Sequence, residues 1–113
     1  MCDLNQPDQP IVYASPEFLA MTGYSADEVR GRNCRFLQSP DGTVSPRSTR
    51  RFVDRDSIRQ MRKAVEKNDE LRIDVVNFKK CGTRFINQLS IVPVSFGDNN
   101  QYRYSVGLMC ERL

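Results

Sequence analysis

The chain has 113 residues, of which 39% are apolar, and its 17 basic and 14 acidic side chains leave a formal net charge of +3. This length predicts one soluble domain with a small core, no apolar run is long enough to span a membrane, and the charge is too small to indicate direct binding of nucleic acid. The chain contains no His, which excludes His-ligated haem, most catalytic zinc sites and the Ser-His and Cys-His nucleophile pairs.

The first predicted elements are two short extended segments, residues 3–4 and 11–13, which are separated by a polar turn that contains proline. A short helix follows them. Ser15 supplies its N-cap, Pro16 suits its first position, and Gly23 suits the position after its last turn.

A second short helix is predicted directly afterwards. Ser25 and Glu28 form the S-x-x-E pattern of a capping box, and Gly31 is suited to the left-handed conformation that ends a helix. Residues 33–38 predict one further short helix, on which Cys34 and Gln38 share a face.

Residues 39–53 show no apolar periodicity and include Pro40, Gly42 and Pro46, so they predict a loop. A loop of this length inside a compact domain is uncommon and often functional. The alternative is a mobile, solvated loop, since doubling the length of a loop costs only about 0.6 kcal/mol. The arginines of this loop are Arg47, Arg50 and Arg51.

The next helix is predicted from an apolar stripe that follows Asp54 or Asp56 as its N-cap. Ile58, Met61 and Val65 recur at i, i+3 and i+7, which places them on one buried face. The basic residues on its other faces are Arg55, Arg59, Arg62 and Lys63.

Three strands are predicted at the end of the chain. Residues 71–78 and 85–92 each alternate between two faces, and residues 101–111 form the last strand. Turns at 80–83 and 97–100 join them as antiparallel hairpins. With the two N-terminal segments they predict an α+β fold, a five-stranded antiparallel sheet with short helices between its second and third strands.

One face of this sheet is unusually apolar for a surface open to water. Its apolar residues are Ile86, Val92, Val94, Val106 and Leu108. A flanking helix, a second protomer or a partner domain is expected to cover it.

Two amides, Asn77 and Asn87, fall on the apolar face of their strands. A buried amide without partners costs about 1–3 kcal/mol, so we expect a polar ligand between them. The alternative is that both bind backbone groups at β-bulges. Gly107 lies on the same face of the last strand as Ser105 and Met109, and a residue without a side chain lets a flat ligand approach the sheet.

The four cysteines, at positions 2, 34, 81 and 110, show no C-x-x-C spacing, which argues against a metal knuckle or a disulfide framework. We therefore expect a reducing compartment, the cytoplasm or the nucleus. Cys2 and Cys110 are interpreted as structural. Cys81, at a predicted turn beside Lys79 and Lys80, is the best candidate for an oxidation-sensitive thiol.

The segment from Gly31 to Gln38, GRNCRFLQ, concentrates the most chemistry. It brings a thiol (Cys34), two amides (Asn33 and Gln38) and a guanidinium (Arg35) together within two turns. A lone intracellular cysteine is usually a small buried hydrophobic residue. That interpretation leaves the flanking polar residues unexplained.

This segment resembles the signature of the LOV domains, the flavin-binding blue-light branch of the PAS superfamily. The segments IVYAS, TGYS, VVNFKK and YRYSVG extend the resemblance from Asp3 to Glu111, and they are similar to the short fungal LOV photoreceptors. The resemblance implies a single PAS/LOV domain over residues 1–113. It also implies FAD as the cofactor, with FMN as the alternative, because an insertion such as residues 39–53 accommodates the adenine half of FAD in the fungal members.

The resemblance also implies the roles of individual residues. Cys34 is the photoreactive thiol, which bonds reversibly to flavin carbon C4a while N5 gains a proton. The residues expected to contact the flavin or its phosphates are Asn33, Arg35, Gln38, Arg50, Arg62, Asn77, Asn87, Gly107 and Met109. Ile11, Met61 and Ile91 are expected to line the pocket and tune reversal. Met109 departs from the family, which carries Gln there, and methionine cannot replace the hydrogen bonds of an amide.

The implied function is a blue-light photoreceptor of light response and photoadaptation, and not an enzyme. The implied partners are a second copy in a light-favoured homodimer and transcription regulators of the white-collar type, without direct nucleic-acid or membrane binding. The alternative is a PAS interaction or flavin redox-sensing module without photochemical signalling, and a flavoenzyme is the third. Cys34 favours the photoreceptor, because the alternatives have no need for a thiol among these polar groups.

Overall fold

The structure, a computed structural model, describes residues 1–45, 52–96 and 102–112, without the side chains of Phe96 and Tyr102. This part of the chain forms an antiparallel sheet of four strands in the order β1-β4-β3-β2. The strands are β1 (Cys2–Asp3), β2 (Leu71–Phe78), β3 (Arg84–Phe96) and β4 (Tyr102–Glu111). The helices are α1 (Pro16–Thr22), α2 (Ala26–Val29), the 3-10 helix η1 (Cys34–Gln38) and α3 (Arg55–Lys67).

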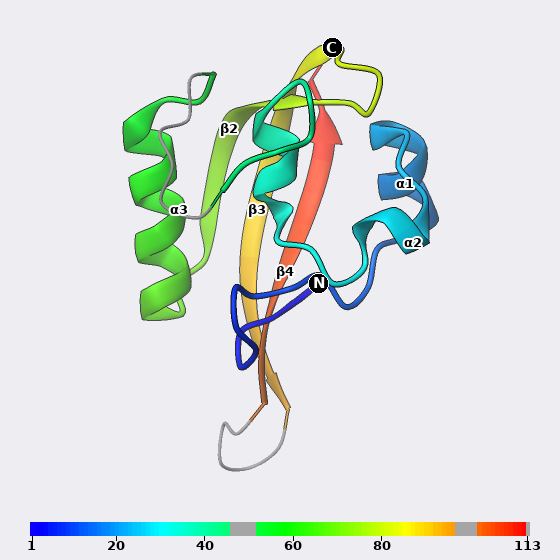
Figure 1. Cartoon of the computed structure of the whole chain (residues 1–113). Coiled ribbons are helices and arrows are strands. Elements are labelled where there is room, and N and C mark those ends of the chain that lie inside the picture. Colours follow the sequence, from blue (N-terminus) through cyan, green and yellow to red (C-terminus); the bar gives the residue numbers. More distant parts are fainter. Residues whose placement is uncertain (46–51, 97–101, 113) are drawn as a thin grey trace.

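The helices all belong to the segment between β1 and β2. In Figure 1, η1 lies in front of the sheet, with α3 on one side of it and α1 and α2 on the other. None of the helices in the described ranges has the length and apolar character needed to cross a membrane.

Local sequence sets the ends of the first two helices, as predicted. Ser15 Oγ accepts a hydrogen bond from the Phe18 N–H at 3.2 Å, and Gly23 ends α1 with a left-handed φ of 83°. In α2, Ser25 Oγ accepts from the Glu28 N–H at 3.2 Å, and Glu28 Oε1 accepts from the Ser25 N–H at 3.0 Å. The capping box is therefore complete.

Glu28 also pairs with Lys80, 2.8 Å away, and this contact together with Ser25 lowers the pKa of Glu28 from 4.5 to about 2. A carboxyl whose pKa is lowered by folding stabilises the fold above its unfolded pKa, and the contribution is lost as pH falls toward the folded pKa. Between pH 4.5 and about 2, we expect wild-type stability to fall more steeply than that of Glu28→Gln. Thermal unfolding across this pH range measures the difference.

The effect is expected to be small, because both side chains of this pair are exposed. Lys80→Gln is the matched control, since it removes the other member of the pair and should flatten the same pH dependence. Equal pH slopes in all three proteins would contradict the assignment.

The second predicted strand, residues 11–13, is not formed, and Ile11 makes only an isolated bridge with Cys2. The Ile11 N–H donates to Arg32 O at 2.8 Å, and Ile11 O accepts from the Gly31 N–H at 2.9 Å. The neighbours of Ile11 bind β1 and the residue before it, since Pro10 O accepts from the Asp3 N–H at 3.0 Å and the Val12 N–H donates to Met1 O at 2.8 Å. The pairing with β1 is limited to this one bridge, so the described sheet has four strands instead of the expected five.

Two groups of buried side chains form the core. The first gathers around η1 and consists of Ile11, Tyr24, Val29, Phe36 and Leu37. The second lies on the inner face of the sheet beneath α3 and consists of Val75, Leu89 and Ile91, with Met61 and Val65 packed against it. Met109 of β4 packs against both groups.

The outer face of the sheet carries the apolar side chains predicted for it. Leu108 is 59% exposed, and the others are half-buried, namely Ile86, Val92, Val94 and Val106. Successive side chains of a strand point to opposite faces. Because alternate residues of β4 lie on the inner face, the residues between them lie on the outer face.

Candidate functional site

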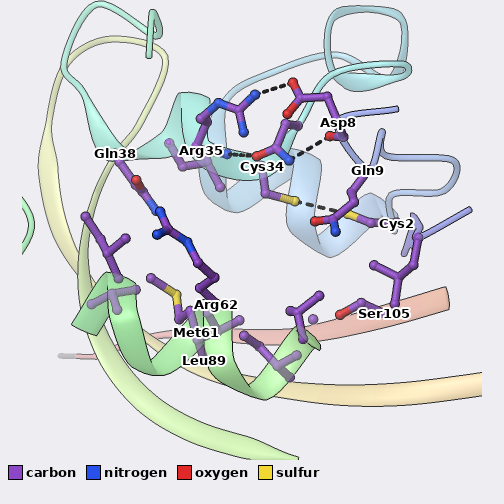
Figure 2. A pocket seen from close by; sticks show the side chains of 18 of the residues that line it. Cys2, Asp8, Gln9, Cys34, Arg35, Gln38, Met61, Arg62, Leu89 and Ser105 are labelled. Atoms are coloured by element: carbon purple, nitrogen blue, oxygen red, sulfur yellow. Dashed lines mark hydrogen bonds and ion pairs between the residues drawn. The ribbon is translucent and has the colours of Figure 1, made fainter. Parts of the chain in front are cut away.

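A cavity of about 1000 Å³ lies between the N-terminal segment, η1, α3 and the inner face of the sheet. This volume is at the upper end of the range for small-molecule and cofactor sites. Its apolar lining comes from α3 and the sheet and includes Ile58, Met61, Val65, Val75, Leu89 and Ile91. Polar side chains enter the same space (Figure 2), including Cys34 and Gln38 from η1 and Arg62 from α3.

The short helix η1 presents Cys34 to this cavity. It is a 3-10 helix, whose three residues per turn align Cys34 with Leu37, and not with Gln38 as expected for an α-helix. All three residues line the cavity. Phe36 does not, because it packs edge-on against the Tyr24 ring with 4.9 Å between the ring centroids, and this contact anchors η1 to the core.

The Cys34 sulfur lies 3.4 Å from the sulfur of Cys2, and both thiols line the cavity (Figure 2). The contact with Cys2 and burial raise the pKa of Cys34 well above its ordinary value, so this side chain is a thiol near neutral pH. The sequence did not predict this contact. Cys2 reaches the cavity only because β1 pairs with β4 at Ser105.

Asn77 and Asn87 meet at the inner face of the sheet. Asn77 lines the cavity, and Asn87 is fully buried next to it, with its Nδ2 donating to Asn77 Oδ1 at 2.9 Å. The alternative, that the two amides bind backbone groups, holds for one amide group, since Asn77 Nδ2 donates to Val76 O at 2.8 Å. Asn87 Oδ1 has no partner among the described residues. A buried acceptor in this state costs about 1–3 kcal/mol until a donor reaches it.

Arg35, which was expected to hold a phosphate, is engaged within the chain. It forms an ion pair with Asp8 that lowers the pKa of that carboxyl, and its Nε donates to Val44 O at 3.2 Å. Asn33 caps η1, because its Oδ1 accepts from the Arg35 N–H at 3.0 Å, and its Nδ2 donates to Asp8 O at 2.8 Å. The turn around Asp8, which sequence analysis did not select, therefore closes over one end of the cavity.

The other predicted cofactor residues fall in three places. Arg62 lines the cavity from α3 and extends toward η1 in Figure 2. Gly107 and Met109 line it from β4. Arg50 lies outside the described residues, together with the rest of segment 46–51 of the predicted loop.

Of the residues expected to line the pocket and tune reversal, Met61 and Ile91 line the cavity, and their effect on reversal stays a prediction. The prediction that Ile11 lines the cavity is wrong. This side chain is 3% exposed and packs in the core group around η1, because its backbone is bound to the segment that follows α2.

Cys81 is exposed at the turn between β2 and β3, away from the cavity lining. Its sulfur lies 3.1 Å from Thr83 Oγ1, and this hydrogen bond lowers the pKa of the Cys81 thiol. Its sensitivity to oxidation stays a prediction.

Comparison with known proteins decides the family of the chain. A model of the PAS domain family matches residues 1–109. The chain belongs to the PAS family.

Within it, this PAS domain is 60% identical to the photo-excited blue-light photoreceptor Vivid, with a TM-score of 0.92 over 97% of this chain and 74% of that one. It is 37% identical over 111 residues to the White collar 1 protein of Neurospora crassa and 36% identical over 111 residues to the blue light receptor lreA of Aspergillus flavus. Each match covers 98% of this chain but only 9% and 13% of those relatives.

These similarities confirm the LOV assignment. The PAS domain is a LOV blue-light photoreceptor domain, and domains of this kind bind a flavin chromophore. In the described part of the chain, no group of three or more His, Cys, Asp or Glu side chains is arranged to hold a metal ion.

The residues of the cavity fit a flavin. The edge of the flavin ring alternates acceptors and donors, O2, N3–H and O4, and the buried Asn87 Oδ1 lacks only a donor. Asn77 and Gln38 add amide groups beside it, and the apolar side chains of α3 and the sheet suit the flat faces of the ring. A guanidinium on each side of the cavity, from Arg35 and Arg62, suits a phosphate.

Proposed function

We propose that this LOV domain binds FAD in the cavity and reports blue light through a reversible covalent bond between Cys34 Sγ and the flavin. One observation carries the proposal. Cys34 presents a protonated thiol to the same cavity that Asn77 lines, and the buried Asn87 Oδ1 next to Asn77 has no partner among the described residues.

The bound flavin supplies the absorption of blue light. Cys34 would supply both the sulfur for the covalent bond and the proton that the flavin takes up, so that no atom is lost. In the dark Cys34 would recover its proton as the bond breaks. The chain contains no His that could act as a base near neutral pH, which favours slow reversal.

The other side chains bind and orient the cofactor in this proposal. Asn77, Asn87 and Gln38 bind the polar edge of the ring, while Gly107 leaves room for the ring against β4. Met109 lies beside it without replacing the hydrogen bonds of an amide. Asn33 holds η1 through its cap, as the hydrogen bond to the Arg35 N–H indicates.

Arg35, Arg62 and Arg50 are proposed to bind the phosphates. In the structure the Arg35 guanidinium pairs with Asp8, which would compete with a phosphate for it. The predicted loop, residues 39–53, is proposed to accommodate the adenine half of FAD. Mass spectrometry of the cofactor released from purified protein should find FAD, and recovery of FMN alone would refute this assignment of the loop.

Replacing Arg62 by Gln should weaken flavin binding by about 1.5 kcal/mol, roughly tenfold in Kd, because it removes a charged donor from the cavity. Titration of the flavin-free protein with FAD, followed by flavin fluorescence, measures the change. Lys63→Gln is the matched control. Lys63 is exposed on the same helix and does not line the cavity, so equal losses in the two variants would reject the role of Arg62.

We propose that the signal leaves the domain as a light-favoured homodimer that involves the outer sheet face and the N-terminal segment. A solved light-state dimer of Vivid, 60% identical to this chain, supports this assignment. The exposed Leu108 offers apolar area for such a contact. Size-exclusion chromatography should give a larger mass for lit samples than for dark ones, and equal masses would contradict the proposal.

Regulators of the white-collar type are the proposed partners, in the cytoplasm or the nucleus, because the White collar 1 protein contains a segment 37% identical to this chain. Light response and photoadaptation are the proposed biological roles.

The decisive test is an absorption spectrum of the purified protein before and after blue light. We expect a flavin band that decreases in light and recovers slowly in the dark. A protein that binds flavin without this change would instead be a flavin redox-sensing module. A protein that binds no flavin, even when FAD is supplied, would refute the proposal as a whole.

A further inference from the structure

The contact between Cys2 and Cys34 makes a thiol pair within the cavity. Their sulfurs lie 3.4 Å apart, and both residues are half-buried. The remaining cysteines differ from them. Cys81 and Cys110 are exposed, and their sulfurs contact Thr83 and the backbone oxygen of Glu111. Among the described residues, Cys2 and Cys34 are the two cysteines whose sulfurs contact each other.

We propose that this pair is a redox switch, in which a hydroperoxide converts the two thiols into a Cys2–Cys34 disulfide that withdraws the Cys34 sulfur from the flavin. The disulfide form does not respond to light, and reduction restores the response. The inference rests on the proposed function, because the switch acts on the sulfur assigned to the photochemistry. It gives the domain an oxidant as a second input.

The positions of the two residues allow the bond to form. A disulfide requires a sulfur separation of about 2.05 Å, so the two atoms must approach by about 1.3 Å. Cys2 belongs to an edge strand of two residues, and Cys34 is the first residue of η1. Short elements at an edge move at lower free-energy cost than the central strands of the sheet.

The protonation of the pair sets the order of the steps. The hydrogen bond from Cys34 lowers the pKa of Cys2, whereas the pKa of Cys34 is raised. Thiolates are the form that attacks peroxides, so Cys2 reacts first. Its sulfur bonds to one peroxide oxygen, the O–O bond breaks, and the other oxygen leaves as water with the Cys2 proton. Cys2 is then a sulfenic acid.

The second step closes the disulfide. The Cys34 sulfur attacks the Cys2 sulfur, the S–O bond breaks, and hydroxide leaves as water with the Cys34 proton. Two thiols are oxidised by two electrons, and one hydrogen peroxide is reduced to two waters. Cys2 carries no negative charge after the first step, so the charge that raised the pKa of Cys34 is gone.

The test treats the flavin-loaded protein with hydrogen peroxide in the dark and then blocks the remaining thiols. We expect non-reducing peptide mapping to find a Cys2–Cys34 linkage. The light-induced loss of flavin absorption should decrease in proportion to the linked fraction. Dithiothreitol should remove the linkage and restore the light response.

Cys2→Ser should keep the same light response before and after peroxide, and Cys2→Ala serves if the serine variant does not fold. Cys110→Ser, which removes an exposed thiol, should respond to peroxide as the wild type does.

The inference is overturned if treated wild type shows no linkage and keeps its full light response. It is also overturned if Cys2→Ser loses its response as the wild type does, since oxidation would then act on Cys34 alone. If untreated wild type shows no light response, the proposed function fails, and the peptide map alone decides whether the disulfide forms.

Discussion

In Cys34→Ala, blue light should no longer change the absorption of the bound flavin. The covalent step needs a thiol at the cavity wall, and alanine supplies neither the sulfur nor its proton. The flavin should remain bound, because the proposed contacts with its ring and phosphates come from other side chains. Replacing a small half-buried residue typically costs about 1 kcal/mol of folding free energy, so the domain should stay folded. Absorption spectra in the dark and after illumination measure the loss.

Cys110→Ala is the control for this experiment, since it removes a thiol that is exposed on β4. It should respond to light as the wild type does. A light response retained in Cys34→Ala would contradict the assignment. It would point to Cys2, whose sulfur is 3.4 Å from that of Cys34, as the reactive group.

In Asn87→Leu, flavin binding should weaken by about 1–3 kcal/mol, which corresponds to a roughly 5- to 150-fold increase in Kd. Asn87 contributes a buried oxygen without a partner in the described chain, and the proposal assigns it to the polar edge of the ring. The flavin-free protein loses the hydrogen bond from Asn87 Nδ2 to Asn77 Oδ1 together with an unsatisfied acceptor, whereas the complex also loses the contact with the ring, so the complex should lose more stability. Flavin titration and thermal unfolding with and without FAD separate the two effects.

Gln88→Leu is the control for this substitution. Gln88 is the next residue of β3, is exposed and does not line the cavity, so its replacement should leave flavin binding unchanged. If Asn87→Leu kept the wild-type Kd, the amide pair would have only a structural role. The cofactor assignment would then depend on the remaining cavity residues.

The helix ends and strand faces could be predicted because they depend on neighbours in the sequence. Ser25 and Glu28 bind each other's backbone across three positions, and Asp54 caps α3 by accepting from the Asp56 N–H. Alternation along β4 likewise predicted that Gly107 and Met109 share the inner face. Such features are fixed by backbone geometry within one turn or one pleat.

The candidate site was predicted in part. The motif around Cys34 indicated a thiol among polar groups, and the structure places such groups around the cavity. The amides of β2 and β3 were expected to bind a polar ligand between them; they bind each other directly, and the ligand stays a prediction. The segment around Ile11 pairs with β1 as its sequence suggests, but only over one isolated bridge. The backbone groups of Ile11 itself bind Gly31 and Arg32, about 20 residues away, and these contacts place its side chain in the core.

By itself, the sequence determined the family and the local elements, and it selected Cys34 as the candidate reactive thiol. Only the tertiary structure decided which groups meet that thiol and its neighbours. Cys2 reaches Cys34 across 32 positions, and Asp8 reaches Arg35 across 27. No local pattern encodes such contacts, because they form only when β1 pairs with β4 and the N-terminal turn closes beside η1. The packing of the whole chain therefore sets the chemical environment of residues that the sequence had already selected.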